Sequence, residues 1–376
     1  MEYAVSNRDT GKVHSMTYNQ SFKLIKHPSP TSPEKRAALM ENPGFGKIFS
    51  DHMVTMNWNA EKGWHNGEVK ARAPFAIDPA AAVLHYAQEI FEGMKAYRTK
   101  DGIALFRPEE NARRMVMSAE RMAMPPVPEK LFVEAVEALV RADADWIPDG
   151  DGSLYIRPFM FSSEPFLGVR PASDYIFCVI ASPVGAYFKG GYKAVTVWVS
   201  DDYTRAAPGG TGAAKCGGNY AASLIAQAEA SKHDCDQVVF LDAVEHRWVE
   251  ELGGMNVFFV MDDNTLVTPP LGGTILPGIT RASIIKLAQE AGLKVEEKPY
   301  SFEEWRRDAE SGRLREAFAC GTAAVVAGIG AVRFKDGSFA IGNSGDGEVT
   351  ARLRASLVDI QRGNAADHHG WVHMVR

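Results

Sequence analysis

A lysine lies within a run of small residues near the middle of the chain. Lys215 begins the segment Lys-Cys-Gly-Gly-Asn-Tyr and is surrounded by Gly212, Ala213, Ala214, Gly217 and Gly218. Backbone next to glycine can approach a ligand closely, and burial of a lysine lowers its pKa and yields a neutral amine that attacks an aldehyde. The segment therefore predicts a lysine on the floor of a cleft. The alternative is a flexible glycine loop that carries an incidental lysine.

A carboxylate follows in a similar setting. Glu251 opens the segment Glu-Leu-Gly-Gly-Met-Asn, which ends at Asn256 and runs into the apolar stretch Val257–Val260. Small residues before a strand leave room for this carboxylate to face a cleft. A covered lysine and a nearby carboxylate are what a cofactor with a carbonyl group would need.

Two turns could bind an anion. In the segment Leu276–Arg281, Gly278 bends the chain, and the amides of Ile279 and Thr280 are unpaired donors at the start of an expected helix. The turn Gly321-Thr322-Ala323 follows a strand and could offer similar contacts. Taken alone, each motif is weak, and the first is more often plain helix capping than an anion site.

The first half of the sequence reads as hairpins and helices. Residues 1 to about 45 are polar and rich in proline, which indicates an extended arm. The elements expected after this arm are a hairpin (His52–Trp58 with a strand from Gly67), a helix (Ala80–Phe91), a hairpin with an Asp-Gly turn at Asp101, two helices (Pro108–Met124 and Lys130–Trp146) and strands at Tyr155 and Tyr175. This order is typical of an α+β fold.

The second half alternates between strands and helices. We expect a strand at Val195–Ser200, a helix from Asn219 to about Lys232, and a further helix at Arg281–Ala291. The glycine-rich passage Pro183–Tyr192 is the best candidate for an interdomain connection. The predicted division is a small N-terminal domain (1–186), a connection (187–200) and a large C-terminal domain with the lysine (201–376).

Composition excludes several functional classes. The chain has 376 residues, 45% of them hydrophobic, and a formal net charge of −6, which argues against nucleic acid as the main partner. The longest apolar stretch, Ala317–Val332, is cut by three glycines and is too short to span a bilayer. The N-terminus lacks the apolar region of a secretory signal and does not resemble a transit peptide, so we expect a cytoplasmic protein.

Other catalytic motifs do not occur in the sequence. The four cysteines are far apart, and the ten histidines form no His-Glu-x-x-His pattern, so no metal site is expected. The chain contains no Walker loop around Lys215 and no Gly-x-Ser-x-Gly elbow.

Taken together, the motifs resemble those of the branched-chain amino acid aminotransferases, which are pyridoxal-phosphate enzymes of fold-type IV. The segments that carry the resemblance begin at Phe45, Leu84, Arg107, Ser153, Glu164, Pro183, Lys215, Glu251, Leu276 and Gly321, in the order of the family. The resemblance implies the two-domain fold of the D-amino acid aminotransferase type, with α+β and α/β character. It also implies ping-pong exchange of amino groups between Leu, Ile or Val and 2-oxoglutarate.

The resemblance assigns residues to pyridoxal 5'-phosphate. Lys215 would hold the cofactor as a Schiff base and later carry a proton between the substrate and the cofactor. Glu251 would face the pyridine nitrogen and Tyr220 the phenolic oxygen. The phosphate would be held by Arg114, Ile279, Thr280 and Thr322. For Arg114, the alternative is a solvated arginine on the outer face of its helix.

The resemblance also assigns the substrate pocket. Tyr86 and the amide of Ala323 would bind the α-carboxylate, and Arg157 would turn toward the distal carboxylate of glutamate. The aromatic walls would be Phe45, Phe91, Tyr155 and Tyr187, which the sequence alone would place in an ordinary core. Leu167 and Val169 would come from the partner subunit, which implies a homodimer.

The chain departs from some relatives at Gly254, where a threonine would give a hydroxyl to the substrate carboxylate. Vertebrate relatives carry a redox Cys-x-x-Cys where Ala324–Ala327 stands here. Two other functions remain open at this point. One is a different fold-type IV enzyme, either a D-amino acid aminotransferase or an aminodeoxychorismate lyase. The other is a non-catalytic protein that binds metabolites on the same scaffold.

Overall fold

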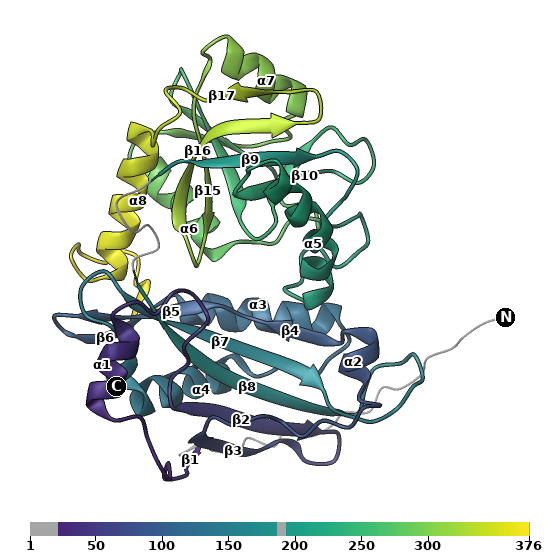
Figure 1. Cartoon of the computed structure of the whole chain (residues 1–376), viewed down its shortest axis with the longest axis vertical. Helices are drawn as coiled ribbons and strands as arrows, with labels where there is room; N and C mark the ends of the chain where they lie inside the picture. Colours follow the sequence, from purple (N-terminus) through teal and green to yellow (C-terminus); the bar gives the residue numbers. More distant parts are fainter. Residues whose placement is uncertain (1–21, 186–192, 376) are drawn as a thin grey trace.

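The computed structural model describes residues 22–185 and 193–375 of the chain. It consists of two halves, each built on a mixed sheet (Figure 1). The first sheet has the strand order β1-β3-β2-β8-β7-β5-β6-β18, and β4 adds to β7. Its strands are β1 (Lys23–Leu24), β2 (His52–Asn59), β3 (Gly63–Ala71), β4 (Glu89–Phe91), β5 (Met94–Thr99), β6 (Gly102–Phe106), β7 (Ser153–Ser162), β8 (Asp174–Val184) and β18 (Val372–Met374).

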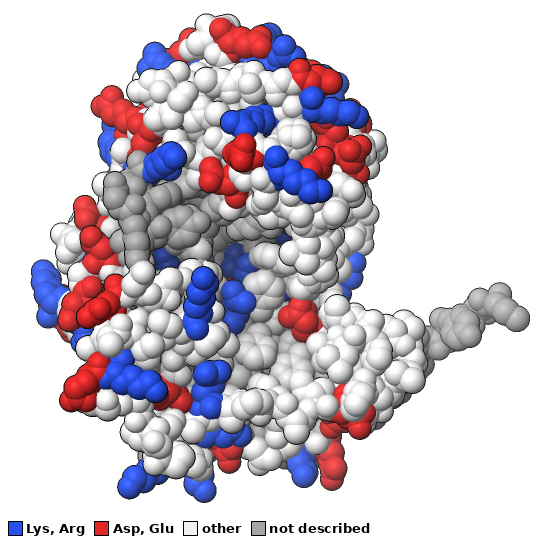
Figure 2. Space-filling model, viewed as in Figure 1, with Lys and Arg blue, Asp and Glu red and all other residues white. Residues whose placement is uncertain are grey.

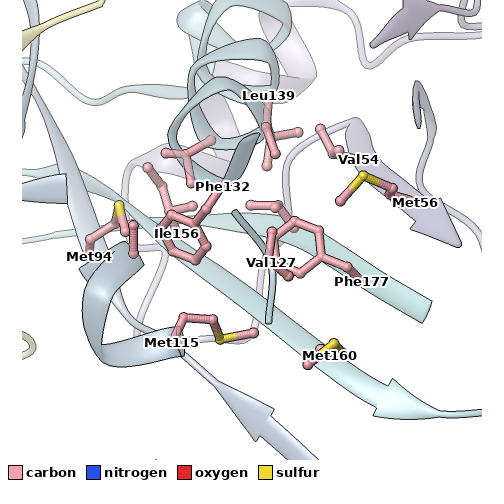
Figure 3. Packing of buried hydrophobic residues seen from close by; sticks show 14 of the residues in the cluster. Val54, Met56, Met94, Met115, Val127, Phe132, Leu139, Ile156, Met160 and Phe177 are labelled. Carbon is pink, nitrogen blue, oxygen red and sulfur yellow. The ribbon is translucent and has the colours of Figure 1, made fainter. Parts of the chain in front are cut away.

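The helices of the first half are α1 (Pro33–Met40), α2 (Ala82–Tyr86), α3 (Pro108–Arg121) and α4 (Glu129–Ala142), followed by a 3-10 turn (Ala144–Trp146). Helices α3 and α4 bury apolar residues in one core with the strands of the sheet, whereas α1 has no buried residue. Figure 3 shows the core under α4, where Phe132 and Leu139 pack toward Val54, Ile156 and Phe177. Both predicted hairpins and both long helices are confirmed, with ends shifted by a few residues.

Two predictions for the first half were wrong. The helix expected at Ala80–Phe91 ends at Tyr86, because Ala87 adopts a left-handed conformation with φ 49° and Glu89–Phe91 then pairs with β7 as a strand. The expected extended arm contains α1, whose N-cap Ser32 accepts a hydrogen bond from the Lys35 amide. Residues 1–21 of the arm lie outside the described residues.

The second sheet has the order β11-β10-β9-β16-β15-β12-β13-β14, and β17 adds to β16. Its strands are β9 (Val195–Ser200), β10 (Gln237–Leu241), β11 (Val249–Leu252), β12 (Asn256–Met261), β13 (Thr265–Thr268), β14 (Lys294–Glu297), β15 (Leu314–Gly321), β16 (Val325–Phe334) and β17 (Gly337–Ala340). Its helices are α5 (Gly217–Lys232), α6 (Ile279–Glu290), α7 (Phe302–Glu310) and α8 (Glu348–Gln361).

The second sheet is covered on both faces. Ile284 of α6 and Leu357 of α8 pack with Phe258 and Phe318 on one face, whereas Trp305 of α7 packs with Phe259 on the other. The cluster under α6 and α8 also includes Tyr97 and Phe106 of the first sheet, so the hydrophobic packing crosses between the halves.

The two halves exchange segments near their boundary. The predicted connection 187–200 includes β9, which lies in the second sheet, and residues 186–192 fall outside the described part of the chain. The last strand, β18, returns from the predicted C-terminal domain and pairs with β6 in the first sheet. We propose that the division between domains lies between β8 and β9.

The start of α5 meets the first sheet directly. Ile90 of β4 pairs with Cys216 as an isolated antiparallel bridge, and the Phe91 amide donates to the Lys215 carbonyl at 3.0 Å. In Figure 1, α5 descends from the second half toward β4. The lysine segment therefore lies at the junction of the two halves.

Candidate active site

A pocket lies between the two halves and collects most of the predicted site residues. Figure 2 shows a hollow at this junction, with blue Lys and Arg atoms in and below it. Its lining includes Phe45, Phe91, Arg114, Tyr155, Arg157, Lys215, Tyr220, Glu251, Gly254, Ile279, Thr280, Thr322 and Ala323. These residues come from both sheets and from loops far apart in the sequence, so the fold brings them together as predicted.

Lys215 is held by its backbone at the base of the pocket. Its amide donates to the Ser118 hydroxyl at 2.9 Å, and its Nζ donates to the Tyr220 hydroxyl at 2.6 Å. Burial, together with the nearby Arg114 charge, lowers the pKa of Lys215 to about 8. Burial also raises the pKa of Tyr220 to about 12, so the phenol keeps its proton. The lowered pKa of Lys215 makes the neutral amine accessible near neutral pH, next to a protonated phenol.

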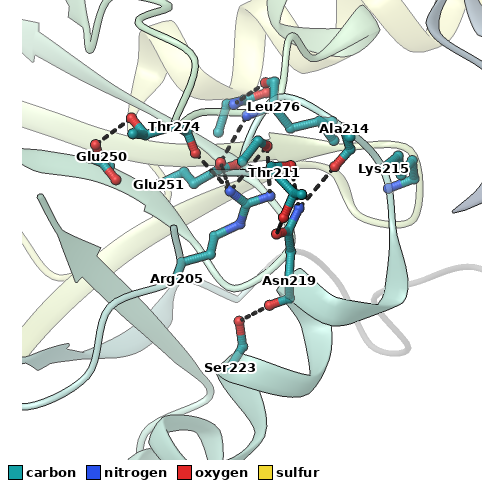
Figure 4. Close-up of polar contacts among 12 residues, drawn as sticks. Arg205, Thr211, Ala214, Lys215, Asn219, Ser223, Glu250, Glu251, Thr274 and Leu276 are labelled. Carbon is teal, nitrogen blue, oxygen red and sulfur yellow. Dashed lines mark hydrogen bonds and ion pairs between the residues drawn. The ribbon is translucent and has the colours of Figure 1, made fainter. Parts of the chain in front are cut away.

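Glu251 is fixed by a buried arginine (Figure 4). The Arg205 guanidinium lies 2.8 Å from its Oε1, and both side chains are 3% exposed. The Leu276 amide donates to the same oxygen at 2.9 Å. Burial raises the pKa of Glu251 to about 7, although Arg205 and this amide act in the opposite direction. A group that binds at Glu251 thus meets a carboxyl that can exchange a proton near neutral pH.

Arg205 itself is tied to two loops. Its guanidinium donates to the carbonyl oxygen of Thr274 at 2.9 Å and to that of Gly212 at 3.4 Å. In Figure 4, its guanidinium points toward Glu251, and Lys215 lies apart from this pair. Arg205 was missed at the sequence level, and the only signal for it is a cation placed within the Gly- and Pro-rich passage before the lysine.

Arg114 and Glu92 form a second buried pair at the other end of the pocket. Arg114 Nη1 also donates to the Pro277 carbonyl at 3.1 Å, next to the turn that starts α6. Glu92 accepts a further hydrogen bond from the side-chain amide of Asn111 at 2.7 Å. Burial alone would lower the pKa of Arg114, but the charge and hydrogen bonds of Glu92 raise it. The reading of Arg114 as a solvated arginine was wrong, because α3 turns this face toward the second half.

Glu92 was also missed at the sequence level. A carboxylate between Phe91 and Gly93, inside an apolar strand region, was the available signal, because such a charge is buried only with a partner.

Backbone donors complete the end of the pocket near Arg114. Helix α6 begins at Ile279, and its N-cap is Gly278. Glycine has no side chain that could accept a hydrogen bond from the first amides of the helix, and no side-chain cap is found there among the described residues. A Cβ at Gly278 would collide with the Asn256 amide oxygen, so glycine is required there. The amides of Ile279 and Thr280 therefore remain available to an anion together with the positive end of the helix dipole.

The turn between β15 and β16 is attached to the first sheet. The Thr322 hydroxyl donates to the Gly93 carbonyl at 3.2 Å, and Lys95 Nζ donates to the Ala323 carbonyl at 2.8 Å. Burial and the charge of Arg362 lower the pKa of Lys95 to about 8. Lys95 is a further residue that the sequence did not single out, and it fixes the orientation of the peptide at Ala323.

Aromatic rings form the opposite wall. Phe45 and Tyr155 meet edge to face with centroids 5.0 Å apart, and Phe91 lies 4.9 Å from Tyr220. The Arg157 guanidinium stacks over Phe91 at 4.7 Å from the ring centroid. This wall suits a hydrocarbon side chain, and Arg157 adds one positive charge to it.

Four predicted residues are not part of this pocket as described. The Tyr86 hydroxyl donates to the Leu167 carbonyl at 2.5 Å, and Tyr86 is 40% exposed. Leu167 and Val169 are 65% and 87% exposed, away from the pocket lining. Tyr86 therefore does not line the pocket of its own chain, because α2 presents it to the loop that carries Leu167. Tyr187 lies outside the described residues.

The donor set fits pyridoxal phosphate. The pocket offers amides and a guanidinium at one end, a carboxyl with a raised pKa at the other, and an amine with a lowered pKa between them. A phosphate, a pyridine nitrogen and an aldehyde are complementary to these three features in that order.

Membrane-spanning helices and metal-binding clusters are both absent from the described residues. Over residues 22–185 and 193–375, the helices are all too short or too polar to cross a membrane. The same residues contain no group of three His, Cys, Asp or Glu side chains placed to bind one metal ion.

Known proteins are similar to this chain in sequence and in fold. Residues 89–332 match the model of the family described as amino-transferase class IV. A probable branched-chain-amino-acid aminotransferase of Streptomyces coelicolor is 55% identical over 94% of this chain and 98% of its own length.

Two solved structures are also similar. The branched-chain amino acid aminotransferase from Escherichia coli has a TM-score of 0.71 at 30% identity and covers 87% of this chain and 99% of its own. The branched-chain amino acid aminotransferase from Thermobaculum terrenum, solved in its PLP-form, has a TM-score of 0.71 at 25% identity, over 87% of this chain and 98% of its own.

Proposed function

The chain belongs to the class IV aminotransferases, and from this we propose that it exchanges amino groups between Leu, Ile or Val and 2-oxoglutarate, with pyridoxal 5'-phosphate as cofactor. Enzymes of this class depend on that cofactor. The branched-chain activity follows from extensive identity to curated branched-chain aminotransferases along nearly the whole chain. The observation that carries the proposal is the pocket in which Lys215, Glu251 and Arg114 converge from separate segments.

The phosphate is bound at the start of α6. The amides of Ile279 and Thr280 would donate to it, and Arg114 would supply the positive charge. The Thr322 hydroxyl donates to the Gly93 carbonyl in this structure, so it would have to turn away from that carbonyl to donate to the phosphate. Glu92 already accepts from Nε and Nη2 of Arg114, and the Pro277 carbonyl accepts from Nη1, so only the remaining N–H groups of the guanidinium would be available to the phosphate. Glu92 thereby fixes the direction in which Arg114 points.

The bound cofactor supplies an electron sink for the bond that is broken at the α-carbon of the substrate. Glu251 supports this sink by facing the pyridine nitrogen, and Arg205 keeps the carboxylate in place. Lys215 would take a proton from the α-carbon of the substrate and deliver it to the C4' carbon of the cofactor, which requires a neutral amine at working pH. Its lowered pKa and its contact with Tyr220 support this role.

The substrate lies between the aromatic wall and the Thr322 turn. The Ala323 amide binds the α-carboxylate, with its peptide held by Lys95. Phe45, Phe91 and Tyr155 enclose a branched hydrocarbon side chain, and Arg157 receives the distal carboxylate of glutamate or 2-oxoglutarate. Gly254 leaves space beside Tyr220 where some relatives have a hydroxyl.

A partner subunit completes the pocket. Leu167 and Val169 are exposed apolar residues on one loop, and Tyr86 is bonded to that loop. We therefore infer that all three reach the site of the other subunit of a homodimer. Tyr86 then contributes to the partner's α-carboxylate site rather than to its own.

We also propose a cytoplasmic location. All four cysteines lie in the described part of the chain, and all are buried free thiols, as expected for a reducing compartment. Tyr187 lies outside the described residues, so its place in the aromatic wall stays a prediction.

An assay of amino transfer tests the function. Protein loaded with pyridoxal phosphate should convert more than one equivalent of leucine, isoleucine or valine per site to the keto acid only when 2-oxoglutarate is present, and glutamate should then accumulate with continued turnover. Transfer from D-alanine with no transfer from the three branched substrates would instead favour a D-amino acid aminotransferase.

A further inference from the structure

The side chain of Glu89 lies against the first residue of α5, the helix that follows the lysine. A Cβ at Gly217 would collide with Glu89 Oε1 and would lie 3.0 Å from its Cδ. Cys216, the N-cap of this 16-residue helix, makes no side-chain capping bond within the described chain. A carboxylate of the first sheet therefore occupies the positive end of a helix of the second half.

Glu89 shares a face of the sheet with Arg157. Phe91 pairs with Phe159 in the antiparallel ladder of β4 and β7. Because side chains alternate along a strand, Glu89 and Phe91 point to the same face as Phe159 and Arg157. The contact of Arg157 with the Phe91 ring agrees with this placement.

The charge of Arg157 is only partly satisfied. Its Nη2 donates to the Tyr155 hydroxyl at 3.0 Å, whereas its Nε is buried and has no hydrogen-bond partner within residues 22–185 and 193–375. Burial raises the pKa of Glu89, and the Gly217 amide and Arg157 oppose this by favouring the ionised form. The ionised carboxylate of Glu89 is thus stabilised by the positive charge of Arg157.

A guanidinium keeps its positive charge in proteins, so the free-energy cost of burying Arg157 depends on which substrate occupies the pocket. When glutamate is bound, its distal carboxylate neutralises Arg157. When a hydrocarbon side chain is bound, the arginine is left among aromatic rings, and a buried charge without a counter-ion is unfavourable. A fixed carboxylate nearby reduces this cost in the hydrocarbon complex.

We propose that Glu89 is a specificity-determining residue that acts as the counter-ion of Arg157 while a branched hydrocarbon side chain occupies the pocket. It is displaced from this role by the distal carboxylate of glutamate or 2-oxoglutarate. This inference rests on the proposed function and explains how one pocket admits both substrate types. Glu89 acts through Arg157 and does not contact the reacting atoms.

The test compares two amino donors in the loaded enzyme with Glu89→Gln. We expect kcat/KM for leucine to fall about fivefold or more while kcat/KM for glutamate stays constant or rises, because only the leucine complex loses its counter-charge. If Glu89 served only to stabilise the start of α5, Glu89→Gln would lower kcat/KM for leucine and for glutamate by the same factor. Equal changes would therefore overturn the proposal.

The chain offers a matched control in Glu316. This carboxylate of β15 accepts hydrogen bonds from the Val349 and Thr350 amides at the start of α8, and a Cβ at Gly347 would collide with it. Like Glu89, it lies against the first turn of a helix, and neither carboxylate is part of the pocket lining. Glu316 differs in that β15 belongs to the second sheet, away from the β4–β7 ladder that carries Arg157. Glu316→Gln should reduce stability and leave the ratio of the two kcat/KM values unchanged.

A double-mutant cycle tests the coupling itself. In an Arg157→Met background, Glu89→Gln should no longer change the ratio for leucine and glutamate. A ratio that still falls would contradict the proposed pairing. Should Glu89→Gln fail to fold, Glu89→Asp carries the test, with a smaller fall in the same direction expected and an unchanged ratio counting against the proposal.

These outcomes are separate from a failure of the proposed function. Wild-type enzyme that does not transfer the amino group of leucine would reject the function. Active wild-type enzyme with an unmoved ratio in Glu89→Gln would reject only the role of Glu89.

Discussion

The carboxylate of Glu92 accepts two hydrogen bonds from the guanidinium of Arg114, at 2.7 Å from Nε and 2.8 Å from Nη2. The two side chains are 0% and 7% exposed. The pair connects the residue after β4 to α3, and it holds the cation that faces the start of α6. The geometry of the phosphate end of the site is therefore set by the first half of the chain.

Breaking this pair should cost both stability and cofactor binding. Glu92→Gln leaves Arg114 buried with a reduced counter-charge, and we expect the free energy of unfolding to fall by about 3 kcal/mol. Denaturant unfolding of the cofactor-free protein measures this change, and titration with pyridoxal phosphate should show weaker binding. Glu310→Gln breaks the exposed pair with Arg306 and should change stability by less than about 0.5 kcal/mol. Similar effects of the two substitutions would contradict the account.

The raised pKa of Glu251 should appear in the pH dependence of stability. The folded pKa is about 7, against an ordinary value of 4.5. Below pH 4.5 the group is protonated in both states. Between pH 4.5 and 7 the unfolded chain loses this proton while the folded protein retains it, so the contribution of Glu251 to stability falls as pH rises.

Cofactor-free wild type should therefore lose stability relative to Glu251→Gln as pH rises from 4.5 to 7, measured by denaturant unfolding. Arg205 lowers the pKa of Glu251, so Arg205→Met should extend this loss to higher pH. A constant difference between wild type and Glu251→Gln over the whole window would show that Glu251 titrates normally.

The sequence singled out Lys215, Tyr220 and Glu251 because they lie in compact motifs rich in small residues, and the structure brings all three to one pocket. Their roles toward a cofactor stay predictions. The fold-type IV architecture is confirmed by the similarity to solved branched-chain aminotransferases. The partners of these residues were not predicted. Arg205 and Glu92 are ordinary charged residues until the fold buries them, and burial depends on contacts between segments far apart in the chain.

Local propensity also failed at one informative place. The apolar spacing of Ala80–Phe91 favours a helix, yet the segment turns at Ala87 and becomes β4. Pairing with β7 and contact with Cys216 outweigh the helical preference of this stretch. That override places Glu89, Phe91 and Glu92 at the junction of the two halves.

Gly254 should accept a hydroxyl side chain. A Cβ there would lie 3.8 Å from Tyr220 Cε1, an ordinary contact. Gly254→Thr should lower KM for leucine about fivefold through one added hydrogen bond to the α-carboxylate, with a small change in kcat. Gly254→Val has the same shape without the hydroxyl and should not lower KM. Equal KM values for the two variants would exclude a role for the hydroxyl.

The contribution of the partner subunit can be tested by mixing two inactive variants. Lys215→Ala removes the amine, and a double substitution of Leu167 and Val169 to Asp disrupts the exposed loop. Co-expressed chains form dimers in which one site combines an intact lysine with an intact loop from the other chain. Activity should then appear above that of either variant alone. If activity never exceeds the sum of the two, the loop serves its own chain.

The central claim is that Lys215 binds pyridoxal phosphate through its amine, and reduction with borohydride followed by peptide mapping tests it most directly. Lys95 provides an internal control, because it is also buried and its pKa is also lowered to about 8, yet it lies outside the pocket lining. The account predicts a visible absorbance band that borohydride removes, with the cofactor attached to Lys215 and absent from Lys95. A colourless protein that cannot be loaded, or a label found on Lys95 or scattered over surface lysines, would contradict it.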